Sequence, residues 1–261
     1  HRGREGTMEQ GKINGVALKE KLKSGKDYYE IRLESIGGLG ANLCGKMLGE
    51  LGVWYFDVNS SSFASYGSEK TGTPVKGFIR YCNKEKEIRV HSPVTEPDLL
   101  VVFHQALLKD ESVYRGCNEN TLVIIALEPG QESVSYRGKG RCYGLEAQKI
   151  AMETHSRINV VMLGGALKLM GIDNLEVGEQ ICKDTLGKKY PDALKSNLDG
   201  MKRGFEEVVK LTGTGIKNLV PLLATTLKQE SKTKGKERLS KMIKSGSPLK
   251  VFTFKNKDLK K

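Results

Sequence analysis

The chain has 261 residues and a formal net charge of +12, with 38% hydrophobic and 28% charged residues. That composition is ordinary for a folded globular protein, and its apolar runs fall well short of the roughly 20 residues of a membrane-spanning helix. The first seven residues precede Met8 and lack the apolar core of a signal peptide, so we leave them out of fold reasoning. We expect a folded protein without a membrane span.

The first half of the chain alternates strand and helix patterns. Residues 29–35 alternate in polarity, as a half-buried strand does, and the glycine-rich stretch after them opens an apolar helical run over residues 40–51. A second strand is predicted at residues 54–58. Two further strands are predicted at residues 75–82 and 87–90, joined by a turn at residues 83–86 into a hairpin. Residues 98–104 and 121–127 are continuous apolar runs, which predict strands of the kind buried in a parallel sheet.

The second half of the chain is predominantly helical in pattern. After a short strand at residues 141–144, helices are predicted at residues 145–154, 159–170, 176–188 and 191–211. Gly164 and Gly165 lie inside the second of these helices and predict close packing against another backbone. The whole pattern predicts an α/β fold, with a mainly parallel sheet, a hairpin and packed helices. We assign residues 1–27 to an N-terminal extension, 28–215 to the α/β domain and 216–261 to a basic C-terminal extension.

Two neighbouring features carry the functional argument. The first is a strand, glycine turn and helix, with the turn at Gly37, Gly38 and Gly40. The second is the loop before residue 75, whose hydroxyl groups, glycines and lysine suit an anion such as a phosphate. The candidate binding residues of this loop are Ser68, Lys70, Thr71, Gly72 and Thr73.

Four segments, in order, resemble the gamma subunit of the 2-oxoacid:ferredoxin oxidoreductases, the pyruvate, 2-oxoglutarate, 2-oxoisovalerate and indolepyruvate types. They are IGGLGANLCGKMLGELG, SYGSEKTGTPVKGFIRY, NVVMLGGALKLMGI and the helix that begins at Pro191 and contains Asn197 and Gly204. The resemblance covers roughly residues 29–210. It implies the gamma-subunit fold and a role in oxidative decarboxylation of a 2-oxoacid, usually to an acyl-CoA, with electrons passed to ferredoxin.

The resemblance also implies the cofactors and partners. Thiamine diphosphate is expected between the alpha and beta subunits, and the iron–sulfur clusters in the beta and delta subunits. This chain is expected to bind no cofactor alone, to frame the active site, to join subunits and to contribute to CoA access through the Lys70 loop. The loop departs from many relatives, which carry small residues around paired glycines where this chain has Thr71-Gly72-Thr73-Pro74.

Three interpretations of the glycine turn remain open. It is a subunit feature of this family, a purely structural strand-to-helix turn, or a dinucleotide site with Asp57 as the ribose-binding acid. The dinucleotide pattern is imperfect, because counting from Gly38 its third small position is occupied by Leu43. A free-standing Rossmann-like nucleotide-binding protein is therefore the alternative function.

Residues that carry chemistry by themselves are sparse. The five cysteines have neither C-x-x-C spacing nor a nearby histidine, which argues against a metal site, and their dispersed, odd number predicts reduced thiols in a cytoplasm. His91, His104 and His155 lack partners at ligand or triad spacing, and we interpret them as isolated. We therefore predict no catalytic residue in this chain and activity only in a complex.

The positive charge is concentrated at the C-terminus. Residues 228–261 contain 12 Lys or Arg and 3 Asp or Glu, a net charge of +9 out of +12. Docking to an acidic partner subunit explains such a tail as well as nucleic-acid binding does, and stacking aromatics are few there. The family resemblance implies protein partners of the alpha, beta and delta type and ferredoxin through the complex, and we expect neither a nucleic acid nor a membrane.

Overall fold

The structure is a computed structural model that describes residues 22, 25–66, 73–130, 134–172, 175–212 and 218–221, the last four and residue 212 for their backbone only. The strands are β1 (Tyr29–Ile36), β2 (Val58–Tyr66), β3 (Pro74–Asn83), β4 (Leu99–Val102), β5 (Leu122–Ala126), β6 (Arg141–Leu145), β7 (Val209–Thr212) and β8 (Asn218–Pro221). The α-helices are α2 (Ala41–Trp54), α3 (Ala147–Thr154), α4 (Ile158–Leu169), α5 (Glu176–Cys182) and α6 (Leu194–Glu206). Short helical turns are η1 (Gln105–Lys109), η2 (Glu111–Val113), the π-helical η3 (Lys183–Gly187) and η4 (Pro191–Ala193).

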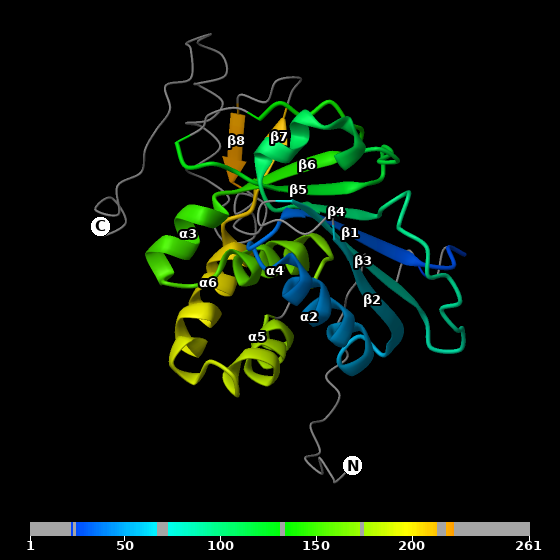
Figure 1. The fold of residues 1–261 in the computed structure, drawn as a ribbon, viewed down its shortest axis with the longest axis horizontal. Coiled ribbons are helices and arrows are strands. Elements are labelled where there is room, and N and C mark those ends of the chain that lie inside the picture. Colours follow the sequence, from blue (N-terminus) through cyan, green and yellow to red (C-terminus); the bar gives the residue numbers. More distant parts are fainter. Residues whose placement is uncertain are drawn as a thin grey trace, which may run out of the picture. The chain divides into compact units, whose positions relative to one another are not determined.

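These strands form one sheet in the order β2-β3-β1-β4-β5-β6-β7-β8 (Figure 1). The central strands β1, β4, β5 and β6 are parallel, as predicted from the apolar patterns of β4 and β5. Antiparallel pairs flank them, β3 and β2 on one side and β7 and β8 on the other. The predicted α/β class with a mainly parallel sheet and a hairpin is confirmed.

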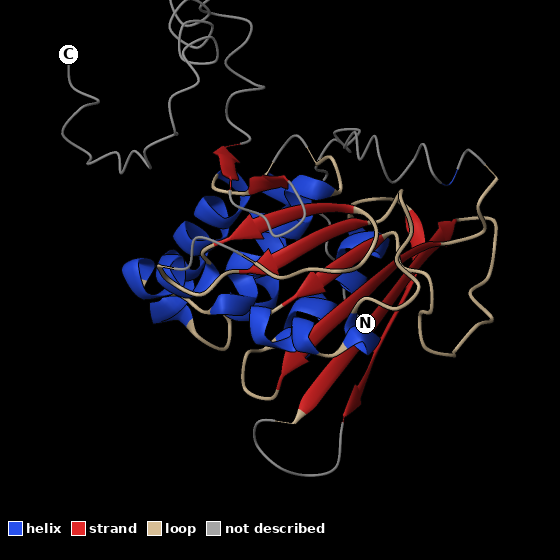
Figure 2. Cartoon of the chain, turned by 90° about the horizontal axis from the view of Figure 1, so that it is seen from above, coloured by secondary structure: helices blue, strands red, loops and turns tan. Residues whose placement is uncertain are grey.

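Helices α2 to α6 gather on one face of the sheet, and the connection that contains η1 and η2 covers the other (Figures 1 and 2). The larger core lies between the sheet and the helices and includes Leu33, Met47 and Leu163. A smaller core beneath η1 and η2 includes Leu100, Val123 and Leu108. Side chains alternate between the two cores along each central strand, because successive residues of a strand point to opposite faces.

The close helix packing predicted from Gly164 is confirmed. A Cβ added at Gly164 would lie 2.0 Å from the carbonyl oxygen of Met201, and one added at Gly204 would lie 2.1 Å from that of Val161. Side chains at these positions would separate α4 from α6. α4 in turn packs against β4 and β5.

The hairpin prediction was wrong in its partner strand. β3 pairs with β2, and residues 87–90 form no strand. The serine-rich residues 60–62, for which no strand was predicted, lie within the edge strand β2. The strand predicted at 54–58 is also wrong, because α2 extends to Trp54 and β2 begins only at Val58. The glycines of α2, at positions 45, 49 and 52, let this helix approach the small side chains of β2 closely.

The helix predicted at residues 191–211 was too long. It begins with η4, continues as α6 to Glu206, and the chain then enters β7, which pairs antiparallel with β6. The amphipathic pattern continues through Val208 and Leu211 because both are buried, one in each core, and burial alone does not distinguish strand from helix. The predicted helix at 176–188 is α5 followed by the π-helical η3.

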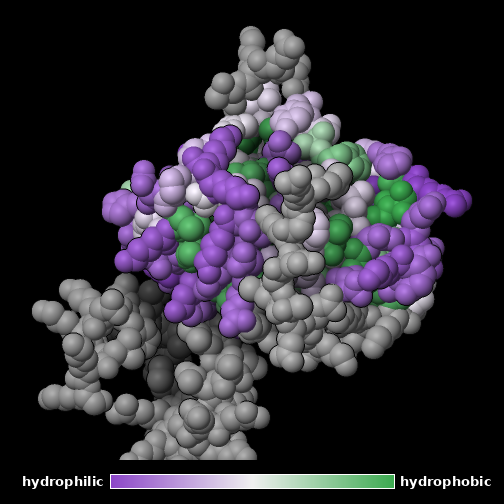
Figure 3. All heavy atoms as spheres, turned by 90° about the horizontal axis from the view of Figure 1, so that it is seen from below, coloured by the Kyte–Doolittle hydropathy of each residue, from purple (hydrophilic) through white to green (hydrophobic). Residues whose placement is uncertain are grey.

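The described surface seen from below is mostly hydrophilic, with apolar side chains in small separate groups (Figure 3). Among the described residues, no helix is long and apolar enough to cross a membrane. The basic segment 222–261 and the N-terminal residues 1–21 lie outside the described part of the chain, so their predicted roles stay predictions.

Candidate functional site at the carboxyl edge of the sheet

The parallel strands β1, β4 and β5 end at one edge of the sheet, and three different segments follow them there. The glycine turn follows β1, Phe103 and His104 follow β4, and Leu127 and Glu128 follow β5. After β1 the chain enters α2 on one face of the sheet, whereas after β4 it enters η1 on the other face. Such a divergence of neighbouring connections is where open α/β sheets bind ligands.

The glycine turn has a conformation that requires glycine. Gly40 caps α2 with a φ of 79°, in the left-handed region that a Cβ disfavours. A Cβ there would also lie 2.9 Å from Nδ2 of Asn159, a buried residue in the first turn of α4. The turn is therefore packed against the N-terminus of a second helix, which supports the structural interpretation of these glycines.

A hydrogen bond connects this turn to the end of the predicted binding loop. The backbone N–H of Gly37 donates to the carbonyl oxygen of Thr73, with an N to O distance of 3.0 Å. In the register of β1 and β3, Ile36 lies opposite Pro74, and in that of β2 and β3, Tyr66 lies opposite Val75. Both ends of the connection 67–72 therefore leave the sheet at the edge where the glycine turn lies.

The predicted site residues are thus partly brought together. Gly37, Gly38, Gly40 and Thr73 share the carboxyl edge. Gly38 has a φ of 101° and no atom within 4 Å of an added Cβ, so its role is conformational. Ser68, Lys70, Thr71 and Gly72 lie outside the described residues, and their assignment to a binding site stays a prediction.

Sequence reasoning missed a crevice at the same edge. A cavity of about 190 Å³ is lined by Leu39, Phe103, His104, Ala126, Leu127, Glu128, Gln148 and Ile158. Most of its lining residues are apolar, and its polar groups come from His104, Glu128 and Gln148. The sequence did contain a signal for this crevice, because His104 and Glu128 each follow a buried apolar strand almost directly, and ligands bind at the carboxyl ends of such strands.

His104 and Glu128 lie next to each other at the ends of β4 and β5. His104 Nδ1 accepts a hydrogen bond from the backbone N–H of Ala106 at 3.2 Å and lies 3.8 Å from Glu128 Oε1. A ring nitrogen that accepts this bond leaves the proton of the neutral imidazole on Nε2. In that state His104 presents a donor, which suits a carbonyl, carboxylate or phosphate oxygen.

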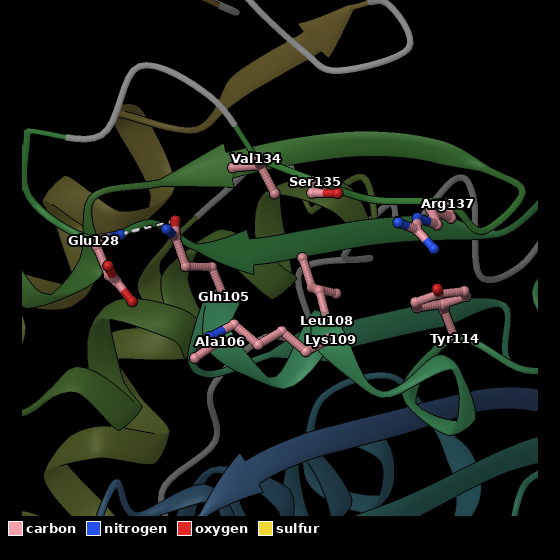
Figure 4. A pocket seen from close by; sticks show the side chains of 9 residues that line it. All are labelled: Gln105, Ala106, Leu108, Lys109, Tyr114, Glu128, Val134, Ser135 and Arg137. Carbon is pink, nitrogen blue, oxygen red and sulfur yellow. Dashed lines mark hydrogen bonds between the residues drawn. The ribbon is translucent and has the colours of Figure 1, made fainter.

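A larger cavity of about 480 Å³ lies on the other face, between η1 and the segment leading to β6 (Figure 4). Gln105 Oε1 accepts a hydrogen bond from the backbone N–H of Glu128 at 3.1 Å, and Glu128 lines both cavities. The cavity is lined by Gln105, Ala106, Leu108, Lys109, Tyr114, Glu128, Val134, Ser135 and Arg137. The carboxyl edge therefore has polar groups accessible on both faces of the sheet.

A buried charged cluster around Arg32 and Glu34 of β1 lies on the face of the sheet that η1 and η2 cover. The Arg32 guanidinium donates to four backbone carbonyls, those of Val94, Thr95, Val113 and Arg115. Glu34 Oε1 lies 3.3 Å from both Arg32 Nε and Lys76 Nζ, but it accepts no hydrogen bond. Burial therefore raises the pKa of the Glu34 carboxyl, and the two cations offset this only in part.

The geometry weighs against a dinucleotide site. β2 runs in the direction of β1, so Asp57, just before β2, lies at the opposite end of the sheet from the glycine turn. The eight steps from Val58 to Tyr66 span about 26 Å at ~3.3 Å per residue. Asp57 is exposed there and pairs with Lys84 at 2.5 Å, so it cannot bind a ribose at the turn.

Comparison with known proteins identifies the family. Residues 30–207 match the family described as pyruvate ferredoxin/flavodoxin oxidoreductase. The chain belongs to this family. Pyruvate synthase subunit PorC of Thermotoga maritima is 31% identical over 188 residues, which cover 70% of this chain and 96% of that protein. The common gamma subunit of the pyruvate/ketoisovalerate oxidoreductases of Pyrococcus abyssi is 33% identical over 179 residues, covering 65% of this chain and 95% of that subunit.

Solved structures agree with this family assignment. The crystal structure of the pyruvate oxidoreductase subunit PORC from Thermotoga maritima matches with a TM-score of 0.58 and 26% identity, covering 70% of this chain and 98% of that one. The 2-oxoglutarate:ferredoxin oxidoreductase of Magnetococcus marinus shares the fold at 18% identity and a TM-score of 0.56, over 69% of this chain and 30% of that one. Within the family, the chain is a gamma-type oxidoreductase subunit, as the four segments predicted.

Proposed function

We propose that this gamma-type subunit frames the active site of a thiamine-diphosphate-dependent 2-oxoacid:ferredoxin oxidoreductase and guides CoA to it. The supporting observation is the carboxyl edge, where the glycine turn, both ends of the Lys70 loop and the crevice meet. When bound in the complex, thiamine diphosphate supplies the carbanion stabilisation that decarboxylation needs. This chain supplies a binding surface beside that chemistry.

The redox centres belong to partner subunits in this proposal. Iron–sulfur clusters require several converging cysteine thiolates. In the part of the chain that the structure describes, no group of three metal-ligating side chains converges, and each of the five cysteines is buried as a free thiol. These residues do not fit a cluster, so electron transfer to ferredoxin is assigned to partners of the beta and delta type, with an alpha-type subunit completing the complex.

CoA is assigned to the loop that contains Lys70. Both ends of that loop lie at the carboxyl edge, and Lys70 is near its middle in sequence. The N-terminus of α2 faces the same edge and has no acidic residue in its first turn, which leaves its backbone N–H groups and positive dipole end available for an anion. A lysine and these N–H groups together suit the phosphates of CoA.

Lys70→Ala tests this assignment in the reconstituted complex. Loss of a charge-assisted hydrogen bond of about 1.5–3 kcal/mol should raise the apparent KM for CoA by roughly ten- to a hundredfold and change that for the 2-oxoacid much less. Lys84→Ala is the matched control, because Lys84 is an exposed lysine at the opposite end of β3. An unchanged KM for CoA would remove Lys70 from the site, and an equal rise for both substrates would indicate a disturbed interface.

The dependence on partners has its own test. The isolated chain, supplied with thiamine diphosphate, a 2-oxoacid and CoA, should not reduce ferredoxin or a viologen dye. The same preparation should gain this activity when alpha-, beta- and delta-type subunits are added. Reduction by the isolated chain would contradict the proposal.

A further inference from the structure

A cluster of exposed cations surrounds one tyrosine at the N-terminal end of α4. The guanidinium carbon of Arg157 lies 5.4 Å from the centroid of the Tyr190 ring, and Lys189 Nζ lies 5.5 Å from the same centroid. Lys188 precedes them and is also exposed. We name these residues, Arg157, Lys188, Lys189 and Tyr190, the basic patch.

The cations of the basic patch have no acidic partner among the described residues. Arg157, Lys188 and Lys189 form no ion pair there, although Asp192 is close to them in sequence. Some surface cations of the same helical layer are paired: Arg203 contacts Glu153 and Glu207, Lys149 contacts Glu146, and Lys183 contacts Glu179. The exposed Lys195 and Lys202 on α6 have no ion pair among the described residues either. The basic patch is therefore a local excess of positive charge, distinguished by two cations that meet on one tyrosine ring.

The backbone holds the basic patch rigidly. The N–H of Arg157 donates to Oδ1 of the buried Asn197 on α6, and its carbonyl oxygen accepts from Val160 at 3.1 Å. Tyr190 donates its N–H to Leu186 at 2.7 Å at the end of the π-helical η3. Such π-helical turns are rare and frequent at functional sites. Two separate elements are thus fixed so that their cations meet on one ring.

This arrangement has an energetic cost. Arg157 lies at the N-terminus of α4, where the helix dipole disfavours a cation, and no acidic residue occupies the first turn of that helix. Lys188 and Lys189 add like charges nearby. A local conflict that no acidic residue offsets in the described part of the chain is typical of a functional surface.

The position of the basic patch relates it to the site. Ile158, next to Arg157, lines the crevice at the carboxyl edge together with Leu39, and Asn159 packs against the glycine turn at Gly40. A partner that covers the basic patch would therefore border the crevice. Arginine and tyrosine are also the residue types enriched among energetically dominant interface positions.

We propose that the basic patch is a docking surface for an acidic, carboxylate-rich face of a partner subunit, placed so that the partner closes over the crevice. The inference rests on the proposed function, because it takes the partner to be a subunit of the same oxidoreductase. A small anion is the weaker candidate, since exposed cations are screened by water and salt. A protein face brings several carboxylates at once and buries the tyrosine.

Charge reversal in the assembled system tests the docking surface. The double variant Arg157→Glu, Lys189→Glu is compared with Lys84→Glu, Lys86→Glu, which changes the net charge equally at exposed lysines of the opposite edge of the sheet. Binding to immobilised alpha-, beta- and delta-type subunits is measured at about 50 mM and about 500 mM salt. The first variant should associate about tenfold more slowly at low salt, with the difference shrinking at high salt, and the control should stay near the original rate.

The outcomes separate the two proposals. If the original chain binds these subunits and both double variants bind equally well, the basic patch is not the docking surface, although the proposed function stands. If the original chain binds none of them, the proposed function fails and this inference with it. Slower binding caused by inorganic phosphate beyond the effect of chloride at equal ionic strength would instead assign the patch to a small anion.

A neutral variant guards against misfolding. Arg157→Gln, Lys189→Gln removes the charges without introducing acids, and it should keep the thermal unfolding midpoint of the original chain while slowing association to a smaller degree. A graded loss from neutralisation to reversal is the expected result. Equal association of the neutral variant and the original chain at low salt would overturn the inference.

Discussion

Replacing Gly40 by alanine should destabilise the protein through one identifiable contact. The residue has a φ of 79°, which costs an alanine about 1–2 kcal/mol. The new methyl group would also lie 2.9 Å from Nδ2 and 3.0 Å from Cγ of Asn159, and overpacking of this kind costs about 1–3 kcal/mol. The sum is about 2–5 kcal/mol, or a fall of roughly 4–20 °C in Tm at ~2–4 °C per kcal/mol.

A double-mutant cycle with Asn159→Ala separates the two contributions. Asn159→Ala removes the contacts of the new methyl group with Nδ2 and Cγ and leaves only the one with Asn159 Cβ, 3.1 Å away. Gly40→Ala should therefore cost less in this background, and the pair should show a coupling of about 1 kcal/mol. Gly38→Ala is the matched control, because Gly38 also has a positive φ but nothing lies within 4 Å of its added Cβ. Its cost should not depend on Asn159.

The assay is urea unfolding of the purified chain, followed by far-UV circular dichroism, with thermal unfolding as a second measurement. A Gly40→Ala cost below about 0.5 kcal/mol, or a cost equal in both backgrounds, would show that the turn does not pack against α4 as described. Binding of NAD, measured in parallel, should be absent in all variants. Loss of a measurable NAD affinity in Gly40→Ala alone would revive the dinucleotide interpretation.

Three further changes test the interior. Arg32→Lys should lower the free energy of unfolding by about 2–4 kcal/mol, because a lysine cannot serve the four carbonyls that the guanidinium satisfies. Burial raises the pKa of the Glu34 carboxyl in the folded state. Its favourable contribution to the free energy of unfolding is therefore present at a pH below the usual glutamate pKa of 4.5 and is lost as the pH rises through the folded-state pKa. Glu34→Gln should flatten the dependence of stability on pH in that range. Burial raises the pKa of Cys142 and of Cys182 to about 12, and all five cysteines are buried, so Ellman's reagent should modify them only after unfolding; rapid reaction of the native protein would contradict this burial.

Short sequence patterns were sufficient to predict an element where the pattern has a single physical explanation. The polarity alternation of β1, the continuous apolar runs of β4 and β5, and the glycines that open α2 are all properties of short segments, and each was placed within a few residues. Gly164 also signalled its role, because a glycine inside an apolar helix has few explanations other than close packing.

The failures involved segments whose structure depends on a distant partner. Residues 60–65 are mostly serine and look like a loop, yet they form a strand because β3 provides hydrogen-bond partners and α2 covers one face through its glycines. β7 looked like the end of a helix until its pairing with β6 was known. Neither the neighbouring strand nor the covering helix can be read from the segment itself, because strand propensity depends on context.

The amino-acid sequence by itself determined the α/β class, the glycine turn and the family, because these depend on periodicity, on backbone conformation and on motifs within short windows. Only the tertiary structure decided which groups meet. His104 and Glu128 are 24 positions apart and come together at the ends of adjacent parallel strands, and Asp57, although close in sequence to the glycine turn, lies at the opposite end of the sheet. Strand order and direction set these distances, and they follow from pairing between segments that are far apart in the chain.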